Sequence, residues 1–201
     1  MARILFADND FPDLVLEREL FARHGIDLDV AQCRTEDDVI RECVATAMQA
    51  PSGSNSLTMQ FVVVKDADKR KAIGEIYRQG FDVYRTLPMY AGAIVKDTDA
   101  EQAQQHRVTD SAEYLAEHMG DAPALVIGCT PGRVEGAPAM MSASVMGNIL
   151  PGMWSFMLAA RARGLGTAWT TIALMMENEV ADVVGMADDM IRDQGKPGSR
   201  P

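Results

Sequence analysis

Short apolar runs and helical periodicity alternate along the N-terminal part of the chain. Two runs, Ile4–Ala7 and Ile26–Ala31, have the length and composition of strands. Between them, over residues 13–23, apolar side chains recur at helical spacing; they are Leu14, Leu16, Leu20 and Phe21. Gly25 stands where a helix commonly ends, because glycine takes the left-handed conformation without steric cost. The pattern therefore predicts a strand, a helix and a second strand.

A second helix and a polar loop follow. Thr35, with Asp38 three residues later, has the spacing of a capped helix start, and apolar periodicity continues to Met48. Pro51 ends this helix, because the residue before a proline is pushed out of the helical region. Residues 51–56 read Pro-Ser-Gly-Ser-Asn-Ser, and such residues form turns and offer hydrogen-bonding groups.

The remaining pattern predicts further strands and helices up to residue 185. Continuous apolar runs at Phe61–Val64 and Pro123–Gly128 predict strands buried on both faces, and Gly166–Thr171 also has strand composition. Residues 84–107 are predicted to form a surface excursion with room for one helix. Helices are predicted over 66–76, 111–119 and 177–184. This alternation indicates an α+β or α/β sheet layered with helices.

The longest helical pattern runs from Ser142 to Arg163 and is apolar nearly all round. Such a helix must be buried, either in a large core or between subunits. Pro151 lies inside it and should kink it by removing a backbone donor, and Gly164 ends it.

Charge and composition narrow the class of protein. The 201 residues carry 19 Lys and Arg against 29 Asp and Glu, a net charge of −10, which argues against binding to a phosphate backbone. The sequence shows no long apolar span and no signal-peptide pattern, so a cytoplasmic protein is expected. Cys33, Cys43 and Cys129 lack the spacing of a disulfide framework or a zinc site, and we expect buried or half-buried thiols.

Several catalytic motifs are excluded. The run Gly164-Leu165-Gly166-Thr167 has Trp169 where a dinucleotide fingerprint needs glycine, and a helix precedes it instead of a strand. The sequence contains no P-loop and no Gly-x-Ser-x-Gly elbow. The three histidines stand in polar surroundings and are expected at the surface; they are His24, His106 and His118.

Two segments could together cradle a flat ring with polar edges. Ser52–Asn55 offer backbone N–H groups and side-chain donors and acceptors. Gly164 and Gly166 let main chain approach a ring face without a Cβ in the way. Each segment taken separately is more typical of a helix end followed by a polar loop.

The order of the stretches Ala47–Ser56, Phe61–Val64 and Ala159–Thr171 resembles the FMN-dependent nitroreductase family. The resemblance runs from about Thr35 to about Met186, and Glu177–Ala181 falls where the family has its late helix. It implies an α+β, nitroreductase-like mixed sheet flanked by helices, and a homodimer built on long apolar helices. It also implies that FMN is held at the subunit interface.

The resemblance further implies which positions line the flavin. The first group is Pro51, Ser52, Gly53, Ser54 and Asn55, with Asn55 as the best polar contact. The second group, which approaches the ring and its N5 edge through main chain, is Gly164, Leu165, Gly166 and Thr167, with Trp169 packed nearby.

The implied reaction passes a hydride from NAD(P)H through the flavin to a nitroaromatic, a quinone or a similar electron-poor acceptor. The cofactor does this chemistry, so no catalytic acid or base is required of the protein, and the sequence shows neither a catalytic histidine nor paired carboxylates. The expected partners are a second copy and a small-molecule acceptor. A metal, nucleic acid or membrane is not expected.

The chain departs from the family pattern at three places. Leu57-Thr58-Met59 stand where the family continues Gln-Pro-Trp, and the Arg-rich opening turn that grips the FMN phosphate is missing. Residues 1–38 instead resemble the opening of a D-2-hydroxyacid dehydrogenase substrate domain. The family's last strand is expected to be missing as well. We therefore divide the chain into residues 1–38, a nitroreductase-like domain over 39–190 and a flexible tail over 191–201.

Two alternatives remain open from the sequence. The first is a non-catalytic dimer of this fold that binds flavin weakly or not at all, through loss of both terminal phosphate-binding segments. The second treats residues 1–38 as the informative part and makes the chain a dehydrogenase fragment. The flavin content of the purified protein separates the oxidoreductase from the non-catalytic dimer.

Overall fold

The computed structural model describes residues 2–7, 13–31, 33 and 35–186. The predicted tail over 191–201 and the position of the expected missing strand lie outside this part. The chain divides into two compact units, one drawn from residues 1–57 and 150–167 and the other from 58–149 and 168–201. Each unit is described by itself.

The first unit begins with a strand, a helix and a strand, as the sequence predicts. Strand β1 (Ala2–Ala7) pairs in parallel with β2 (Ile26–Ala31), so that Ala2 lies opposite Ile26. Parallel strands need a crossover, and α1 (Val15–Arg23) supplies it and packs against β2. Gly25, at φ +67°, turns the chain from the helix into the strand.

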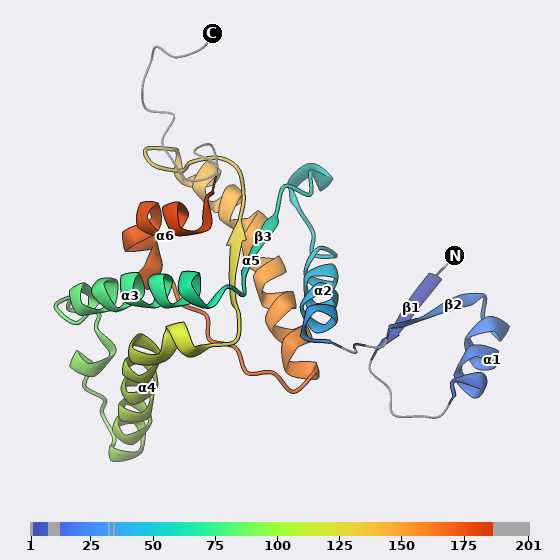
Figure 1. Ribbon diagram of the computed structural model, residues 1–201, viewed down its shortest axis with the longest axis horizontal. Helices are drawn as coiled ribbons and strands as arrows, with labels where there is room; N and C mark the ends of the chain where they lie inside the picture. Colours follow the sequence, from blue (N-terminus) through green and yellow to red (C-terminus); the bar gives the residue numbers. More distant parts are fainter. Residues whose placement is uncertain (1, 8–12, 32, 34, 187–201) are drawn as a thin grey trace, which may run out of the picture. The chain divides into compact units, whose positions relative to one another are not determined.

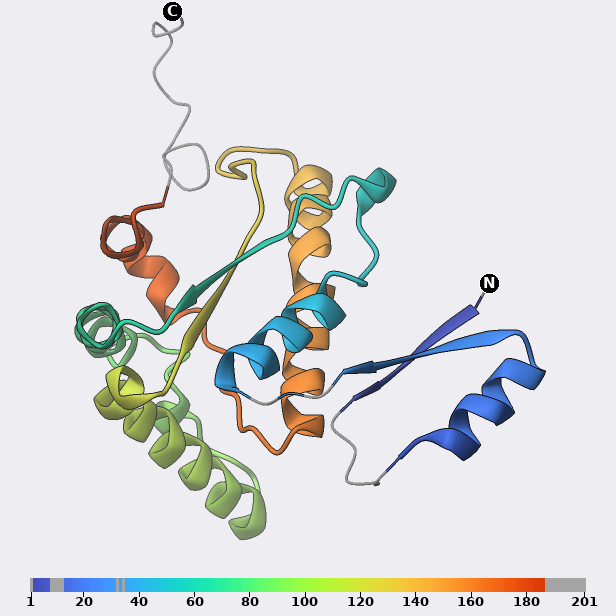
Figure 2. The same ribbon diagram turned by 45° about the vertical axis from the view of Figure 1, so that its right-hand side comes forward.

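The first unit also contains α2 (Glu36–Ala47) and the second half of α5 (Ala139–Ala162). The predicted cap of α2 is confirmed: the Asp38 N–H donates to the Thr35 hydroxyl at 3.2 Å, and the Thr35 N–H donates to the Asp38 carboxylate at 3.0 Å. Helix α2 lies next to the part of α5 from Leu150 onward; α2 runs upward and α5 downward in Figure 1, and α2 passes across α5 in Figure 2.

The second unit is built on an antiparallel pair of strands. Strand β3 (Gln60–Val64) pairs with β4 (Leu125–Cys129), with Val64 opposite Leu125. Helices α3 (Ala67–Tyr84), α4 (Asp99–His118) and α6 (Glu177–Val184) lie to one side of this pair in both views (Figures 1 and 2). The core between them consists of Val64, Ile73, Tyr77, Phe81, Ala116, Met119 and Val180.

Helix α4 corrects the prediction of a surface excursion followed by a short helix capped by Ser111. The helix starts at Asp99, and Thr98 caps it by accepting a hydrogen bond from the Glu101 N–H at 3.3 Å. The sequence pattern failed here because the helix is largely exposed, with Ala116 as its buried residue, so it shows no stripe of large apolar side chains. Helix α3 likewise runs eight residues past its predicted end at residue 76, to Tyr84.

The strand predicted over Gly166–Thr171 is also corrected. These residues form no strand, and they lead into a 3-10 turn, η4 (Ile172–Met176), and then into α6. Their β-branched and aromatic composition favours a strand, but strand formation depends on a neighbouring strand with which to pair. Among the described residues, β3 and β4 pair only with each other.

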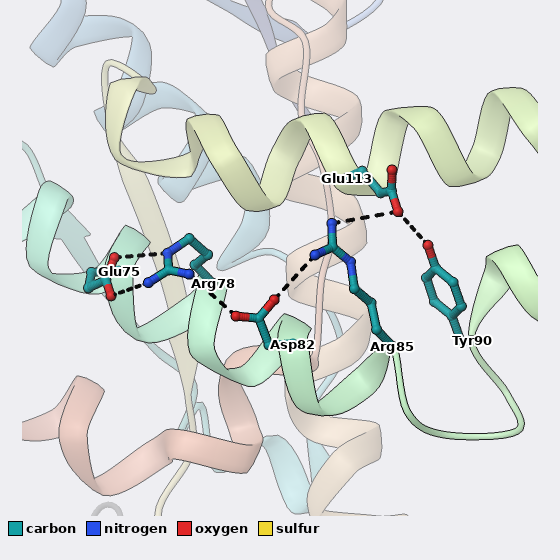
Figure 3. Close-up of polar contacts among 6 residues, drawn as sticks. All are labelled: Glu75, Arg78, Asp82, Arg85, Tyr90 and Glu113. Carbon is teal, nitrogen blue, oxygen red and sulfur yellow. Dashed lines mark hydrogen bonds and ion pairs between the residues drawn. The ribbon is translucent and has the colours of Figure 1, made fainter.

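A chain of polar contacts runs along α3 and reaches α4 (Figure 3). It consists of Glu75, Arg78, Asp82, Arg85, Glu113 and Tyr90. The contacts that tie separate segments together converge on Glu113 of α4, which lies 3.6 Å from the Arg85 guanidinium and accepts a 2.5 Å hydrogen bond from the Tyr90 hydroxyl. The other pairs are local to α3 and exposed, so each contributes little to stability.

Candidate functional site

The loop that follows α2 is closed by its own hydrogen bonds. The Asn55 N–H donates to the Ser52 carbonyl at 3.0 Å, and the Ser56 N–H donates to the Gly53 carbonyl at 3.1 Å. The Ser52 hydroxyl accepts a further bond from the Leu57 N–H at 3.0 Å. These three bonds all lie between residues 52 and 57.

Three residues of this loop have left-handed backbones although none of them is glycine. Ser54 and Asn55 have φ of 54°, and Leu57 has φ of 48°. Asparagine tolerates this region, whereas serine and leucine adopt it at a cost. Strained residues of this kind gather at functional sites when the surroundings enforce them. Sequence reasoning missed this feature because Ser54 and Leu57 carry no signal for a positive φ.

The side chains of the loop are available to a ligand. Residues 53–57 are all exposed, and Ser52 is half-buried. The Asn55 side-chain amide has no hydrogen-bond partner among the described residues. It can therefore offer both a donor and an acceptor to a bound molecule.

The second predicted segment begins at the end of α5, where Gly164 terminates the helix as the sequence predicts. The Leu165 N–H donates to the Ala160 carbonyl and the Gly164 N–H to the Arg161 carbonyl, both at 3.0 Å. This pair of bonds is the Schellman arrangement, and it requires the left-handed conformation of Gly164, at φ +78°. Gly164 thus has a structural role that needs no ligand.

Gly166 has no such structural role. Its φ is not in the left-handed region, and a Cβ built on it would meet no atom within 4 Å. Residues 164–169 are all exposed, and the Leu165 and Trp169 side chains are each 45% exposed. A segment with open main chain and two exposed apolar side chains suits a flat, largely apolar partner.

The structure does not bring the two segments together within one chain. The loop over 51–57 follows the C-terminal end of α2, and residues 164–167 follow the C-terminal end of α5. In both views the chain after α2 leaves toward the top and the chain after α5 leaves at the bottom, so the two segments start from opposite ends of the helix pair (Figures 1 and 2). A single copy therefore does not form the predicted cradle from both of them.

Helix α5, predicted to be buried, exposes one stripe in the single chain. Leu150, Trp154 and Leu158 follow one another at four-residue spacing and are 40%, 55% and 53% exposed. The opposite side is buried through Phe156, Ala159 and Ala160. Of the described helices, α5 is the one with the length and hydropathy of a membrane span, a test that buried helices of other proteins also meet.

Other titratable groups form no second centre in the described part of the chain. As predicted, all three histidines are exposed, Cys43 and Cys129 are buried, and Cys33 is half-buried. Burial raises the pKa of the Cys129 thiol, which keeps it protonated at neutral pH. Within residues 2–7, 13–31, 33 and 35–186, no group of three His, Cys, Asp or Glu side chains is placed to hold a metal ion.

Comparison with known proteins identifies the family. The model of the Nitroreductase family matches residues 33–192, which is most of the chain. The chain belongs to the nitroreductase family. No protein with curated annotation matches the sequence directly.

Solved structures show the nitroreductase fold in this chain. The structure superposes on iodotyrosine deiodinase, solved with FMN and 3-iodo-L-tyrosine, with a TM-score of 0.55 and 18% identity over 84% of this chain and 85% of that one. For a BluB-like flavoprotein from Clostridium difficile 630 the values are 0.50 and 17%, over 84% and 87%. For NfnB from Mycobacterium smegmatis, solved with NADPH, they are 0.50 and 19%, over 76% and 73%.

These comparisons confirm the predicted α+β class and the family resemblance. The family match begins at residue 33, so β1, α1 and β2 precede it. The likeness of residues 1–38 to a dehydrogenase substrate domain stays a prediction.

Proposed function

We propose that this nitroreductase-family protein binds FMN and acts as an NAD(P)H-dependent flavin oxidoreductase. The observation that carries the proposal is the exposed pair of family segments. One is a strained loop with an unpartnered Asn55 amide, and the other has a glycine, Gly166, for which no contact within the described chain accounts. Two structural neighbours were solved with FMN or with NADPH, which supports the same ligand class here.

The residues present fit the isoalloxazine ring. The loop Pro51–Asn55 would hold its polar edge through backbone N–H groups and the Asn55 amide, while Gly164–Thr167 would lie along the ring through main chain. Leu165 and Trp169 would cover apolar parts of the ring and keep water away. Bound FMN would supply hydride acceptance from NAD(P)H and hydride donation to a nitroaromatic, quinone or similar acceptor.

The proposed site needs a second copy of the chain. The two segments leave opposite ends of the α2 and α5 pair, and α5 exposes the stripe of Leu150, Trp154 and Leu158. Pairing of two such stripes would bury apolar area and bring the loop of one copy toward the glycine segment of the other. We therefore propose a homodimer with FMN at the subunit interface. Sedimentation analysis should give a dimer, and Trp154→Glu should give a colourless monomer.

Flavin loading and turnover test the proposal directly. The purified protein should be yellow or should become so when FMN is added, and it should then oxidise NADH or NADPH when a nitroaromatic or a quinone is supplied. A protein that stays colourless in excess FMN overturns the oxidoreductase.

A non-catalytic dimer of the same fold is the second candidate. The observation in its favour is the sequence Leu57-Thr58-Met59, which places an aliphatic residue where the family carries a polar contact, together with the missing Arg-rich turn. This candidate predicts a dimer that shows no flavin absorbance after FMN has been added.

A further inference from the structure

The segment Gly166–Trp169 is fixed at its ends and not along its length. The structure gives these four residues no hydrogen bond to any other described residue. The chain is held before them, where Leu165 bonds to Ala160, and it is held again at Thr170. The position of this backbone therefore depends on those two anchor points.

Thr170 is anchored by a buried tyrosine. The hydroxyl groups of Tyr77 and Thr170 share a hydrogen bond of 3.0 Å, and the Ile172 N–H donates to the same threonine oxygen at 3.3 Å. These bonds fasten the end of the segment to α3 on one side and to the start of η4 on the other. Tyr77 lies 93 positions away in the sequence, so no local pattern announces the contact.

The Tyr77 hydroxyl makes no other hydrogen bond among the described residues. Tyr77 is 1% exposed and packs beside Phe81, with 6.3 Å between ring centroids. A phenylalanine would fill the same space without burying a polar group, which is costly unless the group is hydrogen-bonded. Burial raises the pKa of Tyr77, so the hydroxyl stays protonated and able to share its bond with Thr170.

A glycine on the same helix lets the anchored chain approach closely. A Cβ built on Gly80 would lie 3.2 Å from Cγ2 and 3.3 Å from the carbonyl oxygen of Ile172. The absence of a side chain at this position thus seats the start of η4 directly on α3. Tyr77 and Gly80, one turn apart on α3, together define where the chain after Trp169 is docked.

We propose that Tyr77 is a positioning residue for the flavin site, acting through Thr170 on the main chain of Gly166–Trp169. This inference rests on the proposed function, because it assumes that the segment lies along the flavin ring. In this role Tyr77 touches no substrate. It holds Thr170, the first anchored residue after the segment, so the backbone is already placed when the ring binds and less of it has to be ordered on binding.

The test compares Tyr77→Phe with Tyr84→Phe in the full-length dimer, with FMN affinity measured by fluorescence titration. Tyr84 is the matched control, because it lies on the same helix and its hydroxyl bonds to the Met89 carbonyl and the Ala91 N–H, outside the segment. We expect Tyr77→Phe to weaken FMN binding about three- to ten-fold, the effect of one lost hydrogen bond. Tyr84→Phe should leave FMN binding unchanged.

The threonine side of the contact gives a second arm. Thr170→Val should weaken FMN binding at least as much as Tyr77→Phe, because it also removes the acceptor for the Ile172 N–H. The double variant should be no weaker than Thr170→Val, since both changes remove the same bond. Thr170→Ser, which keeps the hydroxyl, should bind FMN like the wild type.

Amide hydrogen exchange in the flavin-free protein measures the effect of the bond between Tyr77 and Thr170 on the backbone when no cofactor is bound. Exchange at the Ile172 amide, which donates to the Thr170 hydroxyl oxygen, should be faster in Tyr77→Phe than in the wild type and unchanged in Tyr84→Phe. If the wild type binds FMN and Tyr77→Phe changes neither affinity nor exchange, the positioning role is wrong and the proposed function stands. Equal losses of affinity in both tyrosine variants would also overturn it, as a general loss of stability. If the wild type binds no FMN, the proposed function and this inference fail together.

Discussion

The two proposed flavin segments hold their backbones in different ways. Within the loop over 51–57, three hydrogen bonds join residues close in sequence, and three residues have left-handed backbones. The segment over 166–169 has no such bonds among the described residues and is fixed only at its ends, by the Schellman turn at Gly164 and by the contact between Tyr77 and Thr170. Local changes should therefore alter the loop, whereas the segment should respond to changes made far from it.

Of the changes considered, Gly166→Val should reduce FMN loading the most. An added side chain would stand between the main chain and the ring, so we expect FMN loading to be abolished. The apoprotein should fold normally, because a Cβ at this position meets no atom within 4 Å. The flavin content per subunit measures the loss of FMN loading, and the unfolding temperature of the apoprotein measures whether the variant folds normally. Normal flavin content in this variant would place the ring elsewhere.

Asn55→Ala should have a smaller effect, confined to one hydrogen-bonded group of the loop. The amide has no partner among the described residues, so its removal breaks no contact of the fold; alanine adopts a φ of 54° less readily than asparagine, so a small loss of stability is expected beside the loss of affinity. We expect FMN affinity to fall by about 1–2 kcal/mol, the scale of one buried hydrogen bond. Titration of the apoprotein with FMN measures this, with Ser56→Ala in the same exposed loop as the control. An unchanged titration would remove Asn55 from the site.

Leu57→Asn tests the strain in the loop. Leu57 is half-exposed and has φ of 48°, a conformation that asparagine adopts far more readily than leucine. We expect the free energy of unfolding to rise by about 0.5–1 kcal/mol, part of the cost of one strained residue. Chemical denaturation of the apoprotein measures the change. A loss of stability would mean that the leucine side chain contributes more by its contacts than its backbone costs.

Local chemistry explains which parts of this fold the sequence could predict. The cap of α2 was predictable because Thr35 and Asp38 satisfy each other within four residues. The start of α4 and the absence of a strand over 166–171 were not predictable, because one depends on an exposed helix with a small buried face and the other on a neighbouring strand. For the site, residue types pointed to the two segments. The positive φ of Leu57 could not be predicted, because leucine rarely adopts it, and the contact of Tyr77 with Thr170 could not be predicted, because the two residues are far apart in the sequence.

Glu75→Gln should give the smallest effect, a slight change in the pH dependence of stability. It also serves as a control for Tyr77, since both residues lie on α3. Hydrogen bonds from Arg78 (Figure 3) and from Gln79 lower the pKa of Glu75 in the folded protein. A carboxylate with a lowered folded pKa stabilises the fold above its unfolded pKa, and this contribution is lost as pH falls through the folded value.

Denaturation in mildly acidic buffers should therefore show a slightly shallower pH dependence for Glu75→Gln than for the wild type. The difference should shrink in high salt, because the pair is exposed and screened. FMN affinity should not change, because the variant removes surface contacts of α3 and leaves the bond between Tyr77 and Thr170 in place. A loss of affinity as large as that of Tyr77→Phe would show that any disturbance of α3 reaches the flavin segment, and the anchor would then be the whole helix instead of one hydroxyl.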